Sequence, residues 1–403
     1  MSDRRANGAF AGLERRVELG EIDPCGSRQA GRRSGLAICD AGPVVGRADG
    51  GVQAFDDRGT ERWRVDGEGS AITLVPFGDG VVVGERSARG AVRYLVEGAE
   101  RWRHDAADAI GDPTEETRFR LPMVVDAAVG EGTVYAAARR YEREGGERHF
   151  ESSVYALAPD GSVRWRYDAD ASPVSLAASD GGVAVAYNRC PGRHDEGLVA
   201  LGADGSERWT WDPGGGADRR VGDVAALEEG VVATSHADYR GYRIEDGTAV
   251  WRVDLGRPRE GGDEVYTYPN HAYAGGSGVV FLTGNSFPAT GRETEERHPN
   301  EQSAFGYTPA GTRRWRADVG GFCHGIAGDG AELLAPVAQH FRERDPSVHG
   351  WRAFDTVEGP IGGGTTPGVL TAAALEDGRA AAIEEPVAYH DDGAVRGAYA
   401  LWL

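Results

Sequence analysis

One short segment recurs along the chain and limits what the chain can fold into. Its clearest copy, Val154–Asp168 (VYALAPDGSVRWRYD), reads as a strand, a tight turn and a second strand. Asp160-Gly161 is a strong hairpin signal because glycine adopts positive φ without a steric penalty. After the turn, Val163, Trp165 and Tyr167 alternate with polar residues, so one face of this strand is apolar and the other faces water.

A tryptophan marks each copy of this hairpin. Related segments lie at 52–66, 92–105, 198–212, 241–254 and 304–318. The repeated residues are Trp63, Trp102, Trp165, Trp209, Trp251 and Trp315, at spacings of 39, 63, 44, 42 and 64 residues. A period near 40 residues, lengthened twice, is typical of a β-propeller built from four-stranded blades. The sequence therefore predicts one continuous all-β domain over residues 1–403.

The repeats predict eight four-stranded antiparallel blades, with seven as the alternative. The seventh repeat, 324–364, lacks the turn and the tryptophan, and the eighth, Val369–Leu401, lacks a fourth strand. Arg15–Gly20 (RRVELG) is similar to the outer-strand segment Trp251–Gly256 (WRVDLG). We therefore expect Arg15–Gly20 to complete the C-terminal blade, which would leave the ring without an open edge.

These tryptophan hairpins resemble the repeats of the pyrroloquinoline quinone (PQQ)-like β-propellers, and the resemblance covers nearly the whole chain. That superfamily includes quinoprotein alcohol dehydrogenases and the outer-membrane assembly lipoprotein BamB. The resemblance implies that each repeated tryptophan has a structural role, docking between neighbouring blades. It also implies that a dehydrogenase would carry adjacent cysteines in a vicinal disulfide, a calcium ion with a catalytic Asp, and an export signal. The sequence has no Cys-Cys pair, so we expect neither PQQ nor calcium as a cofactor.

The charge balance excludes one class of partner. The formal net charge is −20, and all 44 basic residues are arginine. Such acidity argues against nucleic-acid binding, for which a basic surface is expected. It resembles haloarchaeal proteins, whose carboxylates keep the surface hydrated in concentrated salt; a high-GC genome that replaces Lys codons with Arg codons is the alternative. Thermal melts in low and in molar KCl distinguish these two interpretations.

Cysteines and hydropathy favour a cytoplasmic monomer. Cys25, Cys39, Cys190 and Cys323 form no CxxC motif, so no zinc or haem site is indicated and free thiols are expected. No apolar segment follows Arg4-Arg5, so we expect no signal peptide. No run of 18 apolar residues is present, and no membrane span is expected.

The long connections are expected on one face of the ring, which we call the loop face. It carries the connections between the second and third strands of a blade and those between successive blades. The longest are 106–120, 139–152, 188–196, 256–270, 285–302, 339–349 and 385–394. They carry His149, Phe150, His194, Phe287, His298, His340, Phe341, His349, Tyr389 and His390.

Exposed aromatic and arginine side chains suit protein recognition, and loops on a rigid scaffold are where function usually lies. The sequence therefore predicts a non-catalytic scaffold that binds a protein or peptide through the loop face. No nucleophile elbow, P-loop, dinucleotide-binding loop or HExxH motif is present.

The alternative function is an enzyme or a ligand-binding protein with a polar, metal or quinone site at the mouth of the central channel. Asp126, Asp223, His271 and His324 fall at or near the start of the innermost strand in four repeats. Histidine and carboxylate in a ring could ligate a metal or bind a polar ligand. Channel-lining positions are also wet and accept polar residues without binding anything.

Overall fold

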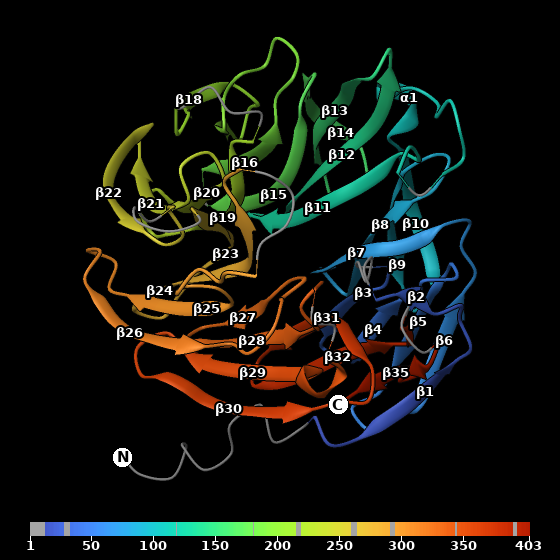
Figure 1. The fold of residues 1–403 in the computed structure, drawn as a ribbon. Helices are drawn as coiled ribbons and strands as arrows, with labels where there is room; N and C mark the ends of the chain where they lie inside the picture. Colours follow the sequence, from blue (N-terminus) through green and yellow to red (C-terminus); the bar gives the residue numbers. More distant parts are fainter. Residues whose placement is uncertain are drawn as a thin grey trace, which may run out of the picture.

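The chain folds into a ring of antiparallel β-sheets (Figure 1). The computed structural model describes residues 13–27, 33–117, 119–179, 181–214, 219–258, 264–290, 295–342, 345–389 and 393–403. Arg4, Arg5 and His390, which entered the sequence predictions, lie outside these ranges. Within them there is a single α-helix, α1 (Ala107–Ile110), and no helix is long and apolar enough to cross a membrane. All four cysteines are free thiols.

The strand pairings group into eight four-stranded blades. Blade 1 consists of β3 (Gly35–Cys39), β4 (Gly42–Gly46), β5 (Val52–Phe55) and β6 (Glu61–Val65), and blade 2 of β7 (Ser70–Phe77), β8 (Gly80–Arg86), β9 (Ala91–Val96) and β10 (Ala99–Asp105). Blade 3 consists of β11 (Met123–Gly130), β12 (Thr133–Glu144), β13 (Glu147–Leu157) and β14 (Val163–Ala169), and blade 4 of β15 (Ser172–Ser179), β16 (Gly182–Arg189), β17 (Leu198–Gly202) and β18 (Glu207–Trp211). Met123 also pairs with Arg86, which joins blades 2 and 3 into one sheet.

Blades 5 to 8 complete the ring. Blade 5 consists of β19 (Val221–Ala226), β20 (Val231–Ser235), β21 (Arg240–Glu245) and β22 (Thr248–Asp254), and blade 6 of β23 (Val265–Gly275), β24 (Gly278–Pro288), β25 (Ser303–Tyr307) and β26 (Arg313–Asp318). Blade 7 consists of β27 (Ala327–Asp329), β28 (Glu332–Val337), β29 (Gly350–Asp355) and β30 (Gly359–Thr365), and blade 8 of β31 (Val369–Glu376), β32 (Arg379–Glu385), β35 (Tyr399–Trp402) and β1 (Arg16–Gly20). A small sheet of β2 (Cys25–Gly26), β33 (Val387–Ala388) and β34 (Val395–Arg396) and a 3-10 helix (Pro346–Val348) lie in the connections.

The predicted closure by the N-terminal strand is confirmed. Strand β1 pairs antiparallel with β35, with Val17 opposite Leu401. Arg15 and Leu403 exchange both backbone hydrogen bonds, at 3.0 and 2.8 Å. Leu19 is buried in a cluster with Ile383 and Tyr399 of the same blade. The first and last described strands are therefore held in one sheet.

Each of the six repeated tryptophans lies against a glycine in the turn between the third and fourth strands of the next blade. Trp102 shows the relation best: a Cβ on Gly161, whose φ is +83°, would lie 2.5 Å from Trp102 Cγ. Trp102 Nε1 also donates a 3.0 Å hydrogen bond to the carbonyl of Pro159 in the same turn. The other pairs are Trp63 with Gly98, Trp165 with Gly205, Trp209 with Gly247, Trp251 with Gly311 and Trp315 with Gly359. The turn of one repeat thus receives the tryptophan of the preceding one.

At the closure a different side chain occupies this position. A Cβ on Gly59, in the corresponding turn of blade 1, would lie 2.5 Å from Val17 Cγ2 of β1. The N-terminal strand therefore supplies both the missing strand of blade 8 and its contact with blade 1.

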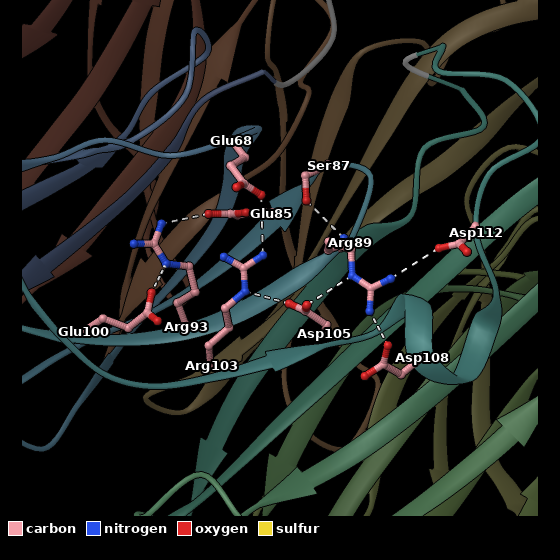
Figure 2. Close-up of polar contacts among 11 residues, drawn as sticks. Glu68, Glu85, Ser87, Arg89, Arg93, Glu100, Arg103, Asp105, Asp108 and Asp112 are labelled. Carbon is pink, nitrogen blue, oxygen red and sulfur yellow. Dashed lines mark hydrogen bonds and ion pairs between the residues drawn. The ribbon is translucent and has the colours of Figure 1, made fainter.

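Buried charges lie within blade 2 (Figure 2). Arg93 is 5% exposed and bonds Glu85, which is 1% exposed, through Nη1 at 2.9 Å, and Glu100 through Nε at 2.6 Å. Nearby, Arg89 pairs with Asp105, Asp108 and Asp112 and so ties the β8–β9 turn to the segment around α1. Because Arg93 and Glu85 are both withdrawn from water, each depends on the other for compensation.

Part of the expected loop content is strand. β12 and β13 stay paired as far as Glu144 and Glu147, so the predicted loop 139–152 is a long hairpin that turns at Gly145 and Gly146. Strand β23 begins at Val265 and β24 ends at Pro288, inside the predicted loops 256–270 and 285–302. These loop predictions were wrong because period-two alternation continues beyond the blade, and Gly-Gly is itself a hairpin turn signal.

Candidate functional site

Asp126 and Asp223 occupy equivalent places in blades 3 and 5. Each follows an irregularity in the innermost strand, β11 or β19. Asp126 accepts hydrogen bonds from the backbone N–H of Ala127 at 3.0 Å and of Leu176 in blade 4 at 2.8 Å. Asp223 accepts from Val224 at 2.9 Å and from Ala272 in blade 6 at 3.0 Å. Both carboxylates therefore link neighbouring innermost strands.

His271 lies beside Asp223, and His324 follows Cys323, whose carbonyl oxygen His271 contacts. Nδ1 of His271 is 3.8 Å from Asp223 Oδ2, and its Nε2 is 3.1 Å from the carbonyl oxygen of Cys323, on the segment that leads into blade 7. His324 precedes β27 rather than starting it, and packs edge-on against Phe322 with ring centroids 5.0 Å apart. β27 begins at Ala327, three residues after His324.

The structure thus pairs His271 with Asp223 across blades 5 and 6, whereas Asp126 makes its contacts between blades 3 and 4. Within the part of the chain that the structure describes, no group of three or more His, Cys, Asp or Glu side chains is arranged to hold a metal ion. The ligand-binding role of these four residues stays a prediction.

Two partly buried histidines, His236 and His324, should make the fold sensitive to acid. Burial lowers the pKa of His324 to about 4 and, with the nearby Arg219 guanidinium, that of His236 to about 3. Unfolded histidine has a pKa near 6.5, so the unfolded chain binds more protons below that value. The neutral histidines contribute fully to the free energy of unfolding above pH 6.5. This contribution falls as the pH drops toward 4, and at pH 5 about 2 kcal/mol is lost for each residue.

Urea unfolding at pH 7.5 and pH 5 measures this loss. The loss should be smaller in His324→Gln than in the unchanged chain or in His149→Gln, which alters an exposed side chain of the β12–β13 hairpin. Equal losses in all three proteins would contradict a neutral buried His324.

A row of half-buried aromatic rings crosses the loop face of blades 5 to 7; we call it the aromatic row. Its members are Tyr239, Tyr266, Tyr268, Phe287 and Phe341. Neighbouring ring centroids lie 4.6 to 5.9 Å apart, and Phe287 and Phe341 stack at 5.6 Å with an interplanar angle of 14°. The guanidinium of Arg219 lies 4.8 Å from the ring centroid of Tyr268, and that of Arg342 lies 4.9 Å from that of Phe341.

Other aromatic and histidine side chains of the loops are buried instead. His298, His340, His349, Phe150 and Tyr389 are each at most 6% exposed. His349 Nε2, for example, lies 2.8 Å from Gln339 Oε1 and 2.9 Å from the Tyr389 hydroxyl. The expectation that the loop aromatics are exposed was wrong for these residues, because the loops pack on one another across blades.

A second feature of the loop face is a cavity of about 390 Å³ over blades 2 to 4, which we call the arginine pocket. Five arginines line it, and no described carboxylate does: Arg33, Arg86, Arg139, Arg148 and Arg189. Three of them occupy the same register, since Arg86, Arg139 and Arg189 each pair with the first residue of the innermost strand. Blades 2, 3 and 4 thus each place one arginine at this edge, a signal that aligning these three repeats reveals.

Comparison with known proteins supports the PQQ-like β-propeller superfamily. Residues 150–297 match the PQQ-like repeat family model described as outer membrane protein assembly factor BamB. No curated protein matches the sequence. Among solved structures, BamB from Moraxella catarrhalis is 15% identical, with a TM-score of 0.55, and the alignment covers 96% of this chain and 98% of that one.

Two further structures have the same fold. Sqt1 from Saccharomyces cerevisiae is 11% identical with a TM-score of 0.57, covering 95% of this chain and 99% of that one. The computationally designed Ika8 protein is 15% identical with a TM-score of 0.55, covering 95% and 99%. At these identities the likeness shows the β-propeller fold alone.

Proposed function

We propose that the protein is a non-catalytic scaffold that binds a protein or peptide partner through the loop face, with the aromatic row as the centre of the interface. The observation that carries this proposal is the row itself. Aromatic rings and arginines are enriched at protein interfaces and supply most of their binding energy. Half-buried rings held by one another and by the rigid ring are ordered before a partner arrives, which lowers the entropic cost of association.

The family resemblance agrees with this role. The matched model describes an assembly factor, and a β-propeller offers a rigid platform on which loops can vary. The predicted channel residues support an enzyme less well than a scaffold, because the carboxylates of Asp126 and Asp223 already accept hydrogen bonds from two backbone groups each.

Affinity capture with paired variants tests the proposal. The full chain, the double variant Phe287→Ser/Phe341→Ser and the control Val163→Ser are used to capture proteins from a lysate of the organism that encodes the chain. Val163 is 44% exposed and lies next to the β13–β14 turn on the opposite face. We expect at least one protein that the full chain and the control recover equally and that the double variant recovers at least tenfold less.

Equal recovery of every captured protein by the folded double variant and the control would contradict the proposal. Melting curves of all three chains verify that they are folded.

A further inference from the structure

The arginine pocket concentrates positive charge on a chain whose formal net charge is −20. With 64 acidic and 44 basic residues, a random surface hollow would be acidic rather than basic. The arginines come from separate blades and from the β12–β13 hairpin, so the fold brings them together. Like charges placed side by side raise the free energy of the protein unless an anion offsets them.

Arg139 lacks such an anion within the described chain. Its Nε is buried and has no hydrogen-bond partner, and the guanidinium lies 5.7 Å from the ring centroid of Phe150. Burial and the neighbouring Arg189 guanidinium lower the pKa of Arg139 to about 10. Arg139 as a whole is partly exposed, but a buried guanidinium nitrogen without a hydrogen-bond partner is costly, and a bound anion would supply that partner.

Two other arginines of the pocket have capacity left for a ligand. Arg33 bonds Glu385 through Nε at 2.6 Å, but its Nη2 is buried without a partner. Arg148 is exposed and faces Arg143 directly across the hairpin. Like charges in that position destabilise a strand pair unless they are neutralised.

Apart from the polar Ser172 and Asn188, the rest of the pocket wall is apolar. Phe119, Met123, Tyr141 and Phe150 contribute to it. A volume near 390 Å³ lies at the small end of the roughly 300–1,000 Å³ found for ligand pockets. The wall therefore suits a small planar or apolar group attached to the anion.

We infer that the arginine pocket is a binding site for an oxyanion, a carboxylate or a phosphate, carried on a small apolar or aromatic group. Planar guanidinium groups bind both oxyanions through paired hydrogen bonds. The inference goes beyond the proposed partner surface, because the arginine pocket lies on blades 2 to 4 and shares no residue with the aromatic row.

Calorimetric titration of the purified full chain at fixed KCl concentration tests this site. The probes are phenyl phosphate, benzoate, inorganic phosphate and, as the uncharged comparison, phenol. We expect phenyl phosphate or benzoate to bind one per chain with a millimolar or tighter Kd, and phenol not to bind. Preference for phenyl phosphate assigns a phosphate ligand, and preference for benzoate assigns a carboxylate. Binding of inorganic phosphate alone would overturn the apolar part of the inference.

Substitutions of pocket residues test whether the anion binds in the arginine pocket. Arg139→Met should weaken binding at least tenfold while leaving the melting temperature unchanged or higher, because it removes a partly buried charge whose Nε has no hydrogen-bond partner. Arg252→Met makes the same charge change on the exposed side of β22 and should bind like the unchanged chain. Arg148→Met, at an exposed position, provides a second pocket variant that does not depend on how the core tolerates the change.

Equal affinity of the Arg139 and Arg252 variants, or no binding of any oxyanion, would overturn the site. Neither result bears on partner capture by the aromatic row, because the titration contains no partner.

Discussion

Deleting residues 1–20 should destabilise the whole ring and make the chain associate. The deletion removes β1, whose backbone pairs with β35, and the buried side chains of Leu13 and Leu19. Full burial of two leucines contributes about 3–6 kcal/mol. The exposed edge of β35 would then present unpaired backbone groups to other molecules. Chemical denaturation measures the stability, and size-exclusion chromatography measures the association.

A shorter deletion, 1–12, separates β1 from the segment that precedes it. This chain keeps Leu13, Leu19 and all described pairings of β1, so it should unfold at a higher denaturant concentration than the 1–20 deletion. If the two truncated chains unfold at the same denaturant concentration and are equally monomeric, then β1 does not contribute to the cooperative unit, and the closure adds nothing to stability.

The repeat made much of this architecture predictable. The DG-type turn and the tryptophan lie in one hairpin, and in the structure each tryptophan contacts such a turn in the next blade, as Trp102 contacts Gly161. A local pattern therefore encodes both the blade and its junction. The closing strand was predictable for the same reason, because Arg15–Gly20 copies an outer strand that the last repeat lacks.

The loop face was less predictable because its structure depends on contacts between distant parts of the chain. Nothing near His349 in sequence indicates that Gln339 and Tyr389 cover it. The five aromatic-row residues come from blades 5 to 7; Phe287 and Phe341 were named from the sequence as loop aromatics, whereas Tyr266 and Tyr268, in the predicted loop 256–270, and Tyr239 were not. Asp126 and Asp223 lie three and two residues after the first residues of β11 and β19, and their hydrogen bonds to the next blade follow from bulges that the sequence does not mark.

Replacing Arg93 should give the largest loss of stability among single substitutions in blade 2. Arg93→Leu leaves Glu85 buried without its guanidinium partner, while Glu85 Oε2 already lacks a hydrogen bond (Figure 2). Removing one member of a buried ion pair costs about 3–5 kcal/mol. Urea unfolding at neutral pH measures this loss. Arg103→Leu is the control, since Arg103 pairs with Asp105 at 2.7 Å and is more exposed; its loss should be no more than about 1 kcal/mol.

Acid and a second substitution distinguish lost charge compensation from lost packing. Burial raises the pKa of Glu85 even with Arg93 present. In Arg93→Leu the pKa should rise further, so the folded state gains a proton before the unfolded state does, and the deficit should shrink as the pH falls through that range. The double variant Glu85→Leu/Arg93→Leu removes both charges and should recover most of the loss at neutral pH. A deficit that is the same at pH 7 and pH 5 and persists in the double variant would mean that Arg93 acts through the packing of its side chain.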